Sequence, residues 1–126
     1  MQADFTRKEL GREGEALAAD YLEGQGYRVL ERNFRCRLGE VDLIAEKGVD
    51  LFFIEVKTRR SVEDVSPLEL VPRSKQVHIS KVAQHYFAEK EVRDRAGRFA
   101  LMVVDCSGAT PQCELIPDIF ALAYGY

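Results

Sequence analysis

Four charged residues recur at the same spacing in two neighbouring apolar segments of the chain. Glu40 and Asp42 lie two residues apart in GEVDLIAEK, and Glu55 and Lys57 lie two residues apart in DLFFIEVKTR. Side chains along a strand alternate between its two faces, so the members of each pair share a face. Carboxylates hold hard divalent cations, and a lysine beside them can neutralise charge on a phosphate. The spacing therefore suggests a metal-dependent site.

The turn between the two segments predicts how these charges meet. Gly48 and Val49 suit a two-residue hairpin loop of type II′, which has glycine at its first central position. Residue 47 then pairs with residue 50, which places Asp42 opposite Glu55 and Glu40 opposite Lys57. The other face becomes entirely apolar, with Val41, Leu43, Ala45, Phe52, Ile54 and Val56. A slip of one residue would move half of these side chains to the charged face, so the register is strongly specified.

Two carboxylates that face each other need a physical reason. At about 5 Å and an effective dielectric constant of about 20, two like charges repel by roughly 3 kcal/mol. Either one carboxyl group is protonated, or a cation lies between them. Lys57 would compensate part of the charge, and a divalent cation would compensate the rest. The alternative is an exposed sheet face with solvated charges, on which Glu40 pairs with Lys57.

The elements that must position these residues belong to the α/β class. Apolar residues at helical spacing predict helices over residues 7–25 and 73–90. Strands are expected over 27–34, 39–46, 50–58, 98–106 and 113–120, and the polar segment 61–72, with two prolines, is expected to be a loop. This order indicates a mixed sheet covered by helices, in which a crossover places the fourth strand beside the third.

Composition limits the function classes. With 126 residues, 46% of them hydrophobic, we expect one soluble domain over 1–126. No apolar run reaches the roughly 20 residues of a membrane span, so we expect a cytoplasmic protein without a membrane partner. The net charge of -3 excludes the overall basic balance of a nonspecific nucleic-acid binder, so such contacts would need local basic patches. Cys36, Cys106 and Cys113 are expected to be reduced, with a Cys106–Cys113 disulfide as the alternative.

Asp42, a short hairpin and Glu55-Val56-Lys57 together resemble the signature of the PD-(D/E)XK nuclease superfamily. The segments GREGEALAADYL, RNFRCRLGEVDLIA, FFIEVKTRR and RSKQ, within roughly residues 11–104, more closely resemble the small bacterial YraN-like family. That family is similar to archaeal Holliday-junction resolvases. The resemblance implies a restriction-endonuclease-like fold: a mixed central β-sheet flanked by helices in the order αβββαββ.

The resemblance also implies roles for individual residues. It makes Asp42 and Glu55 ligands of Mg²⁺ or Mn²⁺. It makes Lys57 the residue that orients or activates the attacking water and stabilises charge on the phosphate. Glu15 matches the helix acid of the resolvase-like site, as a further ligand and catalytic residue.

Two more groups adjoin this set. The backbone carbonyl of Val56 could complete the coordination of the metal. Glu40 is either an extra ligand or the salt-bridge partner of Lys57. Contacts to nucleic acid are expected from local basic residues, namely Arg35, Arg37, Arg59, Arg60, Arg73 and Lys75.

Two functions follow from this interpretation. The first is a metal-dependent nuclease that hydrolyses phosphodiester bonds in DNA, with branched or damaged DNA as the substrate that the resemblance implies. The second is a catalytically silent module that keeps the fold and binds nucleic acid or protein. Resolvase-like relatives often dimerise, so a homodimer is compatible with both functions.

Overall fold

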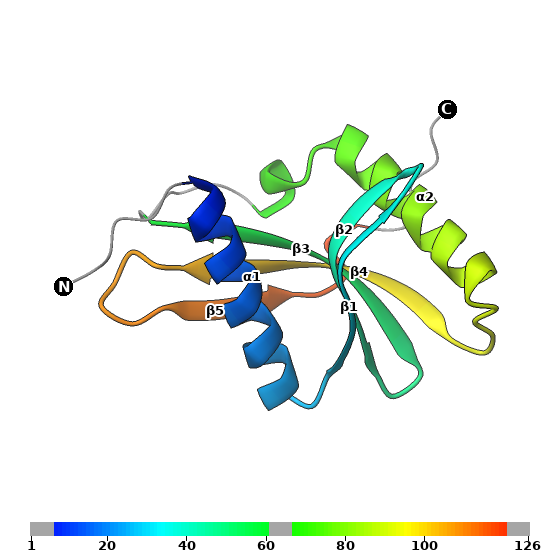
Figure 1. Cartoon of the computed structure of the whole chain (residues 1–126), viewed down its shortest axis with the longest axis horizontal. Coiled ribbons are helices and arrows are strands. Elements are labelled where there is room, and N and C mark those ends of the chain that lie inside the picture. Colours follow the sequence, from blue (N-terminus) through cyan, green and yellow to red (C-terminus); the bar gives the residue numbers. More distant parts are fainter. Residues whose placement is uncertain (1–6, 61–66, 121–126) are drawn as a thin grey trace.

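The computed structural model of the chain describes residues 7–60 and 67–120, which form a five-stranded sheet with a helix on each face (Figure 1). In chain order the elements are α1 (Arg7–Gly24), β1 (Arg28–Cys36), β2 (Gly39–Lys47), β3 (Asp50–Arg59), the 3-10 helix η1 (Pro67–Leu70), α2 (Arg73–Glu89), β4 (Ala96–Asp105) and β5 (Gln112–Ile116). Apart from η1, which lies in the expected loop, this is the predicted order αβββαββ, consistent with a restriction-endonuclease-like fold. No helix in the described ranges is long and apolar enough to cross a membrane.

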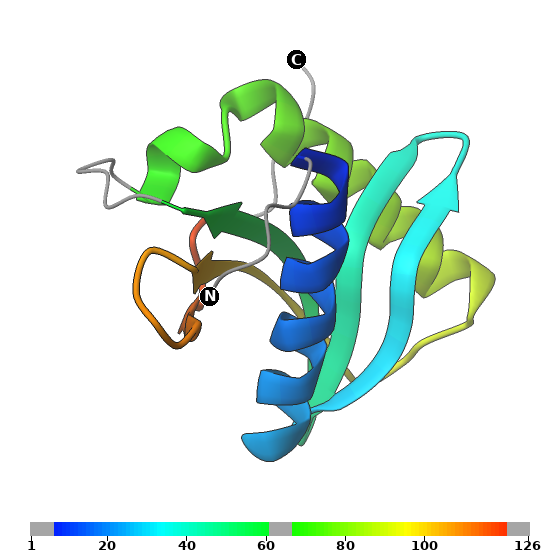
Figure 2. The ribbon, with the colours of Figure 1, turned by 60° about the vertical axis from the view of Figure 1, so that its left-hand side comes forward.

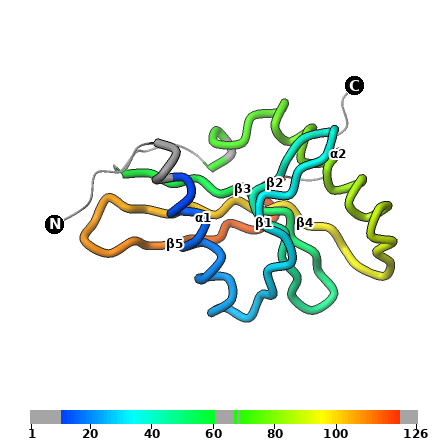
Figure 3. Tube along the Cα trace, viewed as in Figure 1, coloured from blue at the N-terminus to red at the C-terminus, as the bar shows by residue number. Residues whose placement is uncertain are grey.

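The strands follow one another in the sheet in chain order, β1-β2-β3-β4-β5. All neighbours are antiparallel except β3 and β4, which run parallel from Asp50↔Ala96 to Arg59↔Asp105. Parallel neighbours need a long connection, and here α2 supplies it, as the path of the chain in Figure 3 shows. The predicted crossover is therefore confirmed.

Each face of the sheet has its own hydrophobic core, and the two helices lie on opposite faces (Figure 2). Alternate residues of β3 supply the two cores, because neighbouring side chains of a strand point to opposite faces. The α1 core contains Ala18, Ala19, Leu22, Phe52, Ile54 and Met102. The α2 core contains Ile79, Val82, Tyr86, Leu51, Phe53 and Leu101.

The β2–β3 hairpin has the predicted register near its turn. Lys47 pairs with Asp50, and the ladder continues without a shift to Leu43↔Ile54. Gly48 has a φ of 61°, the left-handed conformation that the first central residue of a type II′ turn requires. The pairing expected from the hairpin sequence is therefore confirmed over these residues.

Two expectations about strands are wrong. Val41 does not share a face with Leu43, because it packs in the α2 core whereas Leu43 packs in the α1 core. The last strand ends at Ile116 rather than near residue 120, because Pro117 has no backbone N–H for the ladder and Asp118 adopts a φ of 54°. The first of these differences shapes the candidate site.

Candidate metal and catalytic site

The sheet opens between β2 and β3 beyond the last pair of their ladder, Leu43↔Ile54. There the backbone N–H of Val56 donates a hydrogen bond to Oδ2 of Asp42, with 2.8 Å between the two heavy atoms. In a continued ladder, this N–H of Val56 would donate its hydrogen bond to a backbone carbonyl of β2. Here it donates to a side-chain oxygen instead. This bond holds the Asp42 carboxylate at the point where the strands separate.

In β1, the strand beside β2, the alternation of side chains between the two faces is also interrupted near Asp42. Asn33 of β1 and Asp42 of β2 lie between the pairs Arg32↔Leu43 and Phe34↔Val41, and the φ of Asn33, 51°, is left-handed. The next pair, Phe34↔Val41, packs toward α2. Because the alternation of both strands is interrupted here, Asp42 comes within range of side chains from both faces of the sheet.

Glu55 reaches this point from the α2 face of β3. It is only 5% exposed, and its Oε1 lies 3.2 Å from Nζ of Lys75 on α2. Its Oε2 is buried, and no donor group of the described residues reaches it, although a proton shared with Asp42 would form a hydrogen bond between the two carboxyl groups. Burial and the adjacent Asp42 carboxyl raise the pKa of Glu55 to about 8, and Lys75 offsets only part of this increase. The two carboxyl groups of Asp42 and Glu55 therefore strongly favour either a proton shared between them or an added cation.

Glu15 reaches Asp42 from the opposite face, where α1 packs. The pKa of Glu15 is raised by burial and by the charge of Asp42, while a hydrogen bond from the Asn33 side chain partly counters this effect. A Cβ atom on Gly14 would lie 1.8 Å from Oγ1 of Thr58 on β3. Glycine thus lets α1 approach the sheet closely, which brings Glu15 to the opening.

Lys57 and Glu40 do not pair with each other. Alternation along β3 places Lys57 on the same face as Glu55, where it is half-buried and forms no ion pair with a described residue. Glu40 is exposed and forms an ion pair with Arg35 across the β1–β2 hairpin, with 2.9 Å between Nε and Oε2. The second alternative for Glu40, a salt bridge to Lys57, is therefore not the arrangement found.

The predicted basic residues differ in their exposure and in their ion-pair partners. Arg37, Arg60 and Arg73 are exposed, and Arg59 pairs with Asp105 at 3.7 Å. Lys75 instead points to the buried Glu55. It stands in the first turn of α2, an end of a helix that normally favours negative charge.

The sequence interpretation missed two contributors to this cluster. Spacing and charge do not single out Asn33. Asparagine is, however, enriched among residues in the left-handed conformation and depleted in strands, so its position within β1 indicates an irregularity of that strand. Lys75 was assigned to nucleic acid and not to Glu55. No spacing rule connects Lys75 with Glu55, because the two residues are twenty positions apart and belong to different elements, α2 and β3.

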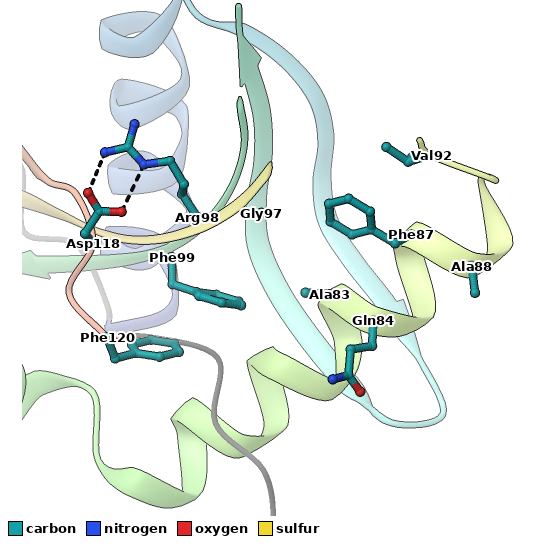
Figure 4. Close-up of a pocket in the computed structure, with 10 residues that line it drawn as sticks. All are labelled: Ala83, Gln84, Phe87, Ala88, Val92, Gly97, Arg98, Phe99, Asp118 and Phe120. Atoms are coloured by element: carbon teal, nitrogen blue, oxygen red, sulfur yellow. Dashed lines mark hydrogen bonds and ion pairs between the residues drawn. The ribbon is translucent and has the colours of Figure 1, made fainter. Parts of the chain in front are cut away.

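A groove of about 790 Å³ lies elsewhere, between α2, the start of β4 and the segment after β5 (Figure 4). Phe99 and Phe120 stack there with their ring centroids 4.7 Å apart. At its rim Arg98 donates hydrogen bonds to Asp118 and to Asp50. None of the predicted site residues lines this groove.

The donor set around Asp42 and Glu55 fits a hard divalent cation in its chemistry. Carboxylate and carbonyl oxygens are the ligands that Mg²⁺ and Mn²⁺ use, and Oε2 of Glu55 is a buried acceptor without a partner. In the side-chain arrangement described, no group of three or more His, Cys, Asp or Glu residues within 7–60 and 67–120 forms a ready cage for an ion. A bound ion would therefore require some rearrangement of these side chains.

Comparison with known proteins places this chain in a family. The model of Uncharacterised protein family UPF0102 matches residues 14–104. A UPF0102 protein of Geobacter metallireducens is 46% identical over 93% of this chain and 96% of its own length. A relative from Dictyoglomus thermophilum is 45% identical over 92% of this chain and all of its own length, and one from Syntrophus aciditrophicus is 44% identical over 91% of each. The matched residues include the segments that carry Glu15, Asp42, Glu55 and Lys75, so the chain belongs to Uncharacterised protein family UPF0102.

Proposed function

We propose that this protein is a metal-dependent nuclease of the PD-(D/E)XK superfamily that hydrolyses phosphodiester bonds in DNA. Branched DNA is the substrate class that we would test first, following the resemblance to junction resolvases. The proposal joins a fold consistent with the restriction-endonuclease-like class to a cluster of acids and lysines at an opening in its sheet.

One observation carries the proposal. Glu55 is buried beside Asp42, its pKa is raised to about 8, and one of its oxygens has no hydrogen-bond donor among the described residues. Such an arrangement costs free energy in the folded protein, since burying a charged or unpaired polar group is unfavourable. Strongly perturbed carboxyl groups of this kind cluster at functional sites. A purely structural role would be served better by an apolar residue at position 55.

In this proposal Asp42 and Glu55 hold the cation, and Glu15 and the Val56 carbonyl are further candidate ligands. A bound Mg²⁺ or Mn²⁺ supplies Lewis acidity and lowers the pKa of a bound water. The hydrogen bond from Val56 N–H keeps Asp42 oriented toward the opening. Lys57, on the face of Glu55, supplies positive charge for the phosphate and orients the attacking water.

The nucleic acid would lie across the opening, against the first turn of α2. This helix begins after Pro72 without a side-chain cap and carries Arg73 and Lys75 in its first turn, where no acidic residue is present. The N-terminus of a helix attracts anions, and a phosphate there would also be attracted by these two cationic side chains. Arg37 and Arg60, both exposed, lie near the ends of the strands that form the opening and could contact further phosphates.

The test combines metal binding with cleavage. Thermal unfolding of the wild type and Asp42→Asn is measured with EDTA and with Mn²⁺, and cleavage is measured on linear, flapped and four-way DNA. We expect Mn²⁺ to stabilise the wild type by about 2.7 kcal/mol at 100 times its Kd, and the variant much less. We expect the substitution to reduce cleavage by roughly 100-fold or more, because it removes a ligand that acts in the transition state.

Glu114→Gln is the matched control, because it removes one exposed carboxylate from the same sheet, on β5. It should behave like the wild type in both assays. If the wild type binds DNA but shows neither stabilisation by Mn²⁺ nor cleavage that depends on Asp42, the catalytically silent module becomes the better description. Cleavage that survives Asp42→Asn would point to a contaminating nuclease.

A further inference from the structure

Lys75 forms an ion pair with the acidic cluster, the group of Glu15, Asp42 and Glu55, and the proposed reaction gives this ion pair no role. Its Nζ lies 3.2 Å from Oε1 of Glu55, and its side chain remains 38% exposed, whereas that of Glu55 is 6% exposed. The ion pair thus joins a buried carboxylate to a lysine whose stem reaches solvent. No other ion pair within the described ranges involves Glu55 or Asp42.

We propose that Lys75 is a positioning residue that occupies the cation position beside Glu55 and is displaced when a divalent cation binds. This inference rests on the proposed function, since it assigns a step to the same site. The ammonium group contacts one oxygen of Glu55, and no donor within the described residues contacts the other oxygen, Oε2. A single ammonium group therefore satisfies the carboxylate incompletely.

The chemistry of the two cations explains why displacement is favourable. A lysine is a compact point charge on a flexible four-carbon stem, so it can leave the pair by rotating about side-chain bonds. An ammonium group stays about 3 Å from an oxygen, whereas Mg²⁺ binds oxygen at roughly 2.1 Å and carries twice the charge. The divalent ion thus compensates two adjacent carboxylates better, while Lys75 keeps Glu55 ordered before the ion arrives.

When the cation displaces Lys75 from Glu55, the ammonium group of Lys75 can contact a phosphate of the nucleic acid. Lys75 belongs to the first turn of α2, beside Arg73, and both side chains start from a helix end that favours anions. Once released from Glu55, the ammonium group is available to the nucleic acid. Metal binding would then prepare the surface that receives the substrate.

The first experiment measures Mn²⁺ affinity from the electron paramagnetic resonance signal of the free ion, at pH 8.5, where protons compete less. Lys75→Met should bind Mn²⁺ about tenfold more tightly than the wild type, because the competing cation is gone. Lys81→Met removes an exposed charge from the same helix and is the matched control. It should change the Mn²⁺ affinity less than about threefold, and Lys75→Arg should show no gain.

A second measurement uses only the wild type, which keeps the inference testable if Lys75→Met folds poorly. Lysine side chains are labelled with an amine-reactive reagent with and without saturating Mn²⁺, and each site is quantified by mass spectrometry. Labelling of Lys75 should rise several-fold with Mn²⁺, while that of the exposed Lys81 should stay constant. Unchanged labelling of Lys75 at saturation would overturn the inference.

The outcomes separate this inference from the proposed function. If the wild type binds Mn²⁺ but Lys75→Met gains no more than Lys81→Met, the metal site stands and the displacement of Lys75 is wrong. If only Lys75→Met binds Mn²⁺, Lys75 blocks the site in the wild type, and its displacement by the ion is wrong. If no variant binds Mn²⁺, the proposed metal site and this inference both fail.

Discussion

The acidic cluster of Glu15, Asp42 and Glu55 and the aromatic groove lined by Phe99 and Phe120 are two regions of this protein in which charges are arranged in opposite ways. In the groove, Arg98 donates hydrogen bonds to Asp118 and lowers the pKa of that carboxyl. In the cluster, Asp42 raises the pKa of Glu55, and only one oxygen of Glu55 has an ion-pair partner. Size alone would direct attention to the groove, whereas uncompensated charge directs it to the cluster.

The difference between the two regions shows which part of the fold is destabilised by its own charges. Around the groove, aromatic packing and paired charges each favour the folded state. In the cluster, like charges lie close together at a point where the β2–β3 ladder has already ended. Energetic conflict that persists in a packed protein is expected at functional sites, because consistent local interactions are the rule elsewhere.

Phe99→Ala should show the largest effect on stability and thereby test the structural role of the groove. Phe99 is 5% exposed and stacks on Phe120, so truncation should lower the free energy of unfolding by about 3–5 kcal/mol. Chemical denaturation provides the measurement, with the exposed Leu38→Ala as the control. Mn²⁺ affinity should remain unchanged. A loss of Mn²⁺ binding in a folded Phe99→Ala protein would break the distinction between the two regions.

Gly14→Ala should lower the free energy of unfolding less than Phe99→Ala does, and it should also disturb the acidic cluster. The added Cβ would meet Oγ1 of Thr58, so α1 must move away from β3, at a cost of about 1–3 kcal/mol. Because Glu15 is the next residue, cleavage should also fall. Urea denaturation and the cleavage assay measure the two effects.

Gly11→Ala is the matched control on the same helix, because no atom of the described residues lies within 4 Å of its added Cβ. It should be neutral or stabilise the protein by up to about 1 kcal/mol, since alanine favours helix. Thr58→Ala combined with Gly14→Ala should recover part of the loss. Equal effects of the two single glycine substitutions would show that the close approach of α1 at Gly14 does not matter.

The pH dependence of stability should sharpen the comparison without any change in the groove. The pKa of Glu55 is about 8 in the folded protein and near 4.5 without its neighbours, so folding takes up a proton between these values. Stability should therefore rise as pH falls from 8.5 to 5.5, by up to about 3 kcal/mol in EDTA.

Glu55→Gln should lack this contribution, because its amide does not titrate in this range. The variant should be more stable than the wild type at pH 8.5, and the gap should close toward pH 5.5. Denaturation curves at four pH values provide the measurement. Parallel profiles for the two proteins would mean that Glu55 is not the group that titrates.

Much of the fold could be predicted from local sequence. Apolar periodicity located both helices, and Gly48-Val49 together with the apolar set on β3 fixed the register from Lys47↔Asp50 to Leu43↔Ile54. Local patterns suffice there because turn geometry and burial on one face agree with each other. Prediction failed at Val41, where strict alternation was assumed but the strands change phase.

The acidic cluster could be predicted only in part. The sequence singled out Glu15, Asp42 and Glu55, but it treated Asp42 and Glu55 as directly opposed residues of a regular ladder. Asp42 instead leaves the ladder and accepts a hydrogen bond from Val56. Asn33 and Lys75 complete the surroundings of the acids from β1 and α2.

The sequence by itself determined the kinds of groups available, the order of the elements and the pairing near the turn, because these depend on interactions between residues close in the chain. Only the tertiary structure decided that β2 and β3 separate at Asp42, that α1 touches Thr58 through Gly14, and that Lys75 meets Glu55. These contacts join segments that are distant in sequence. Their geometry depends on how both helices pack against the two faces of one sheet, which no local pattern specifies.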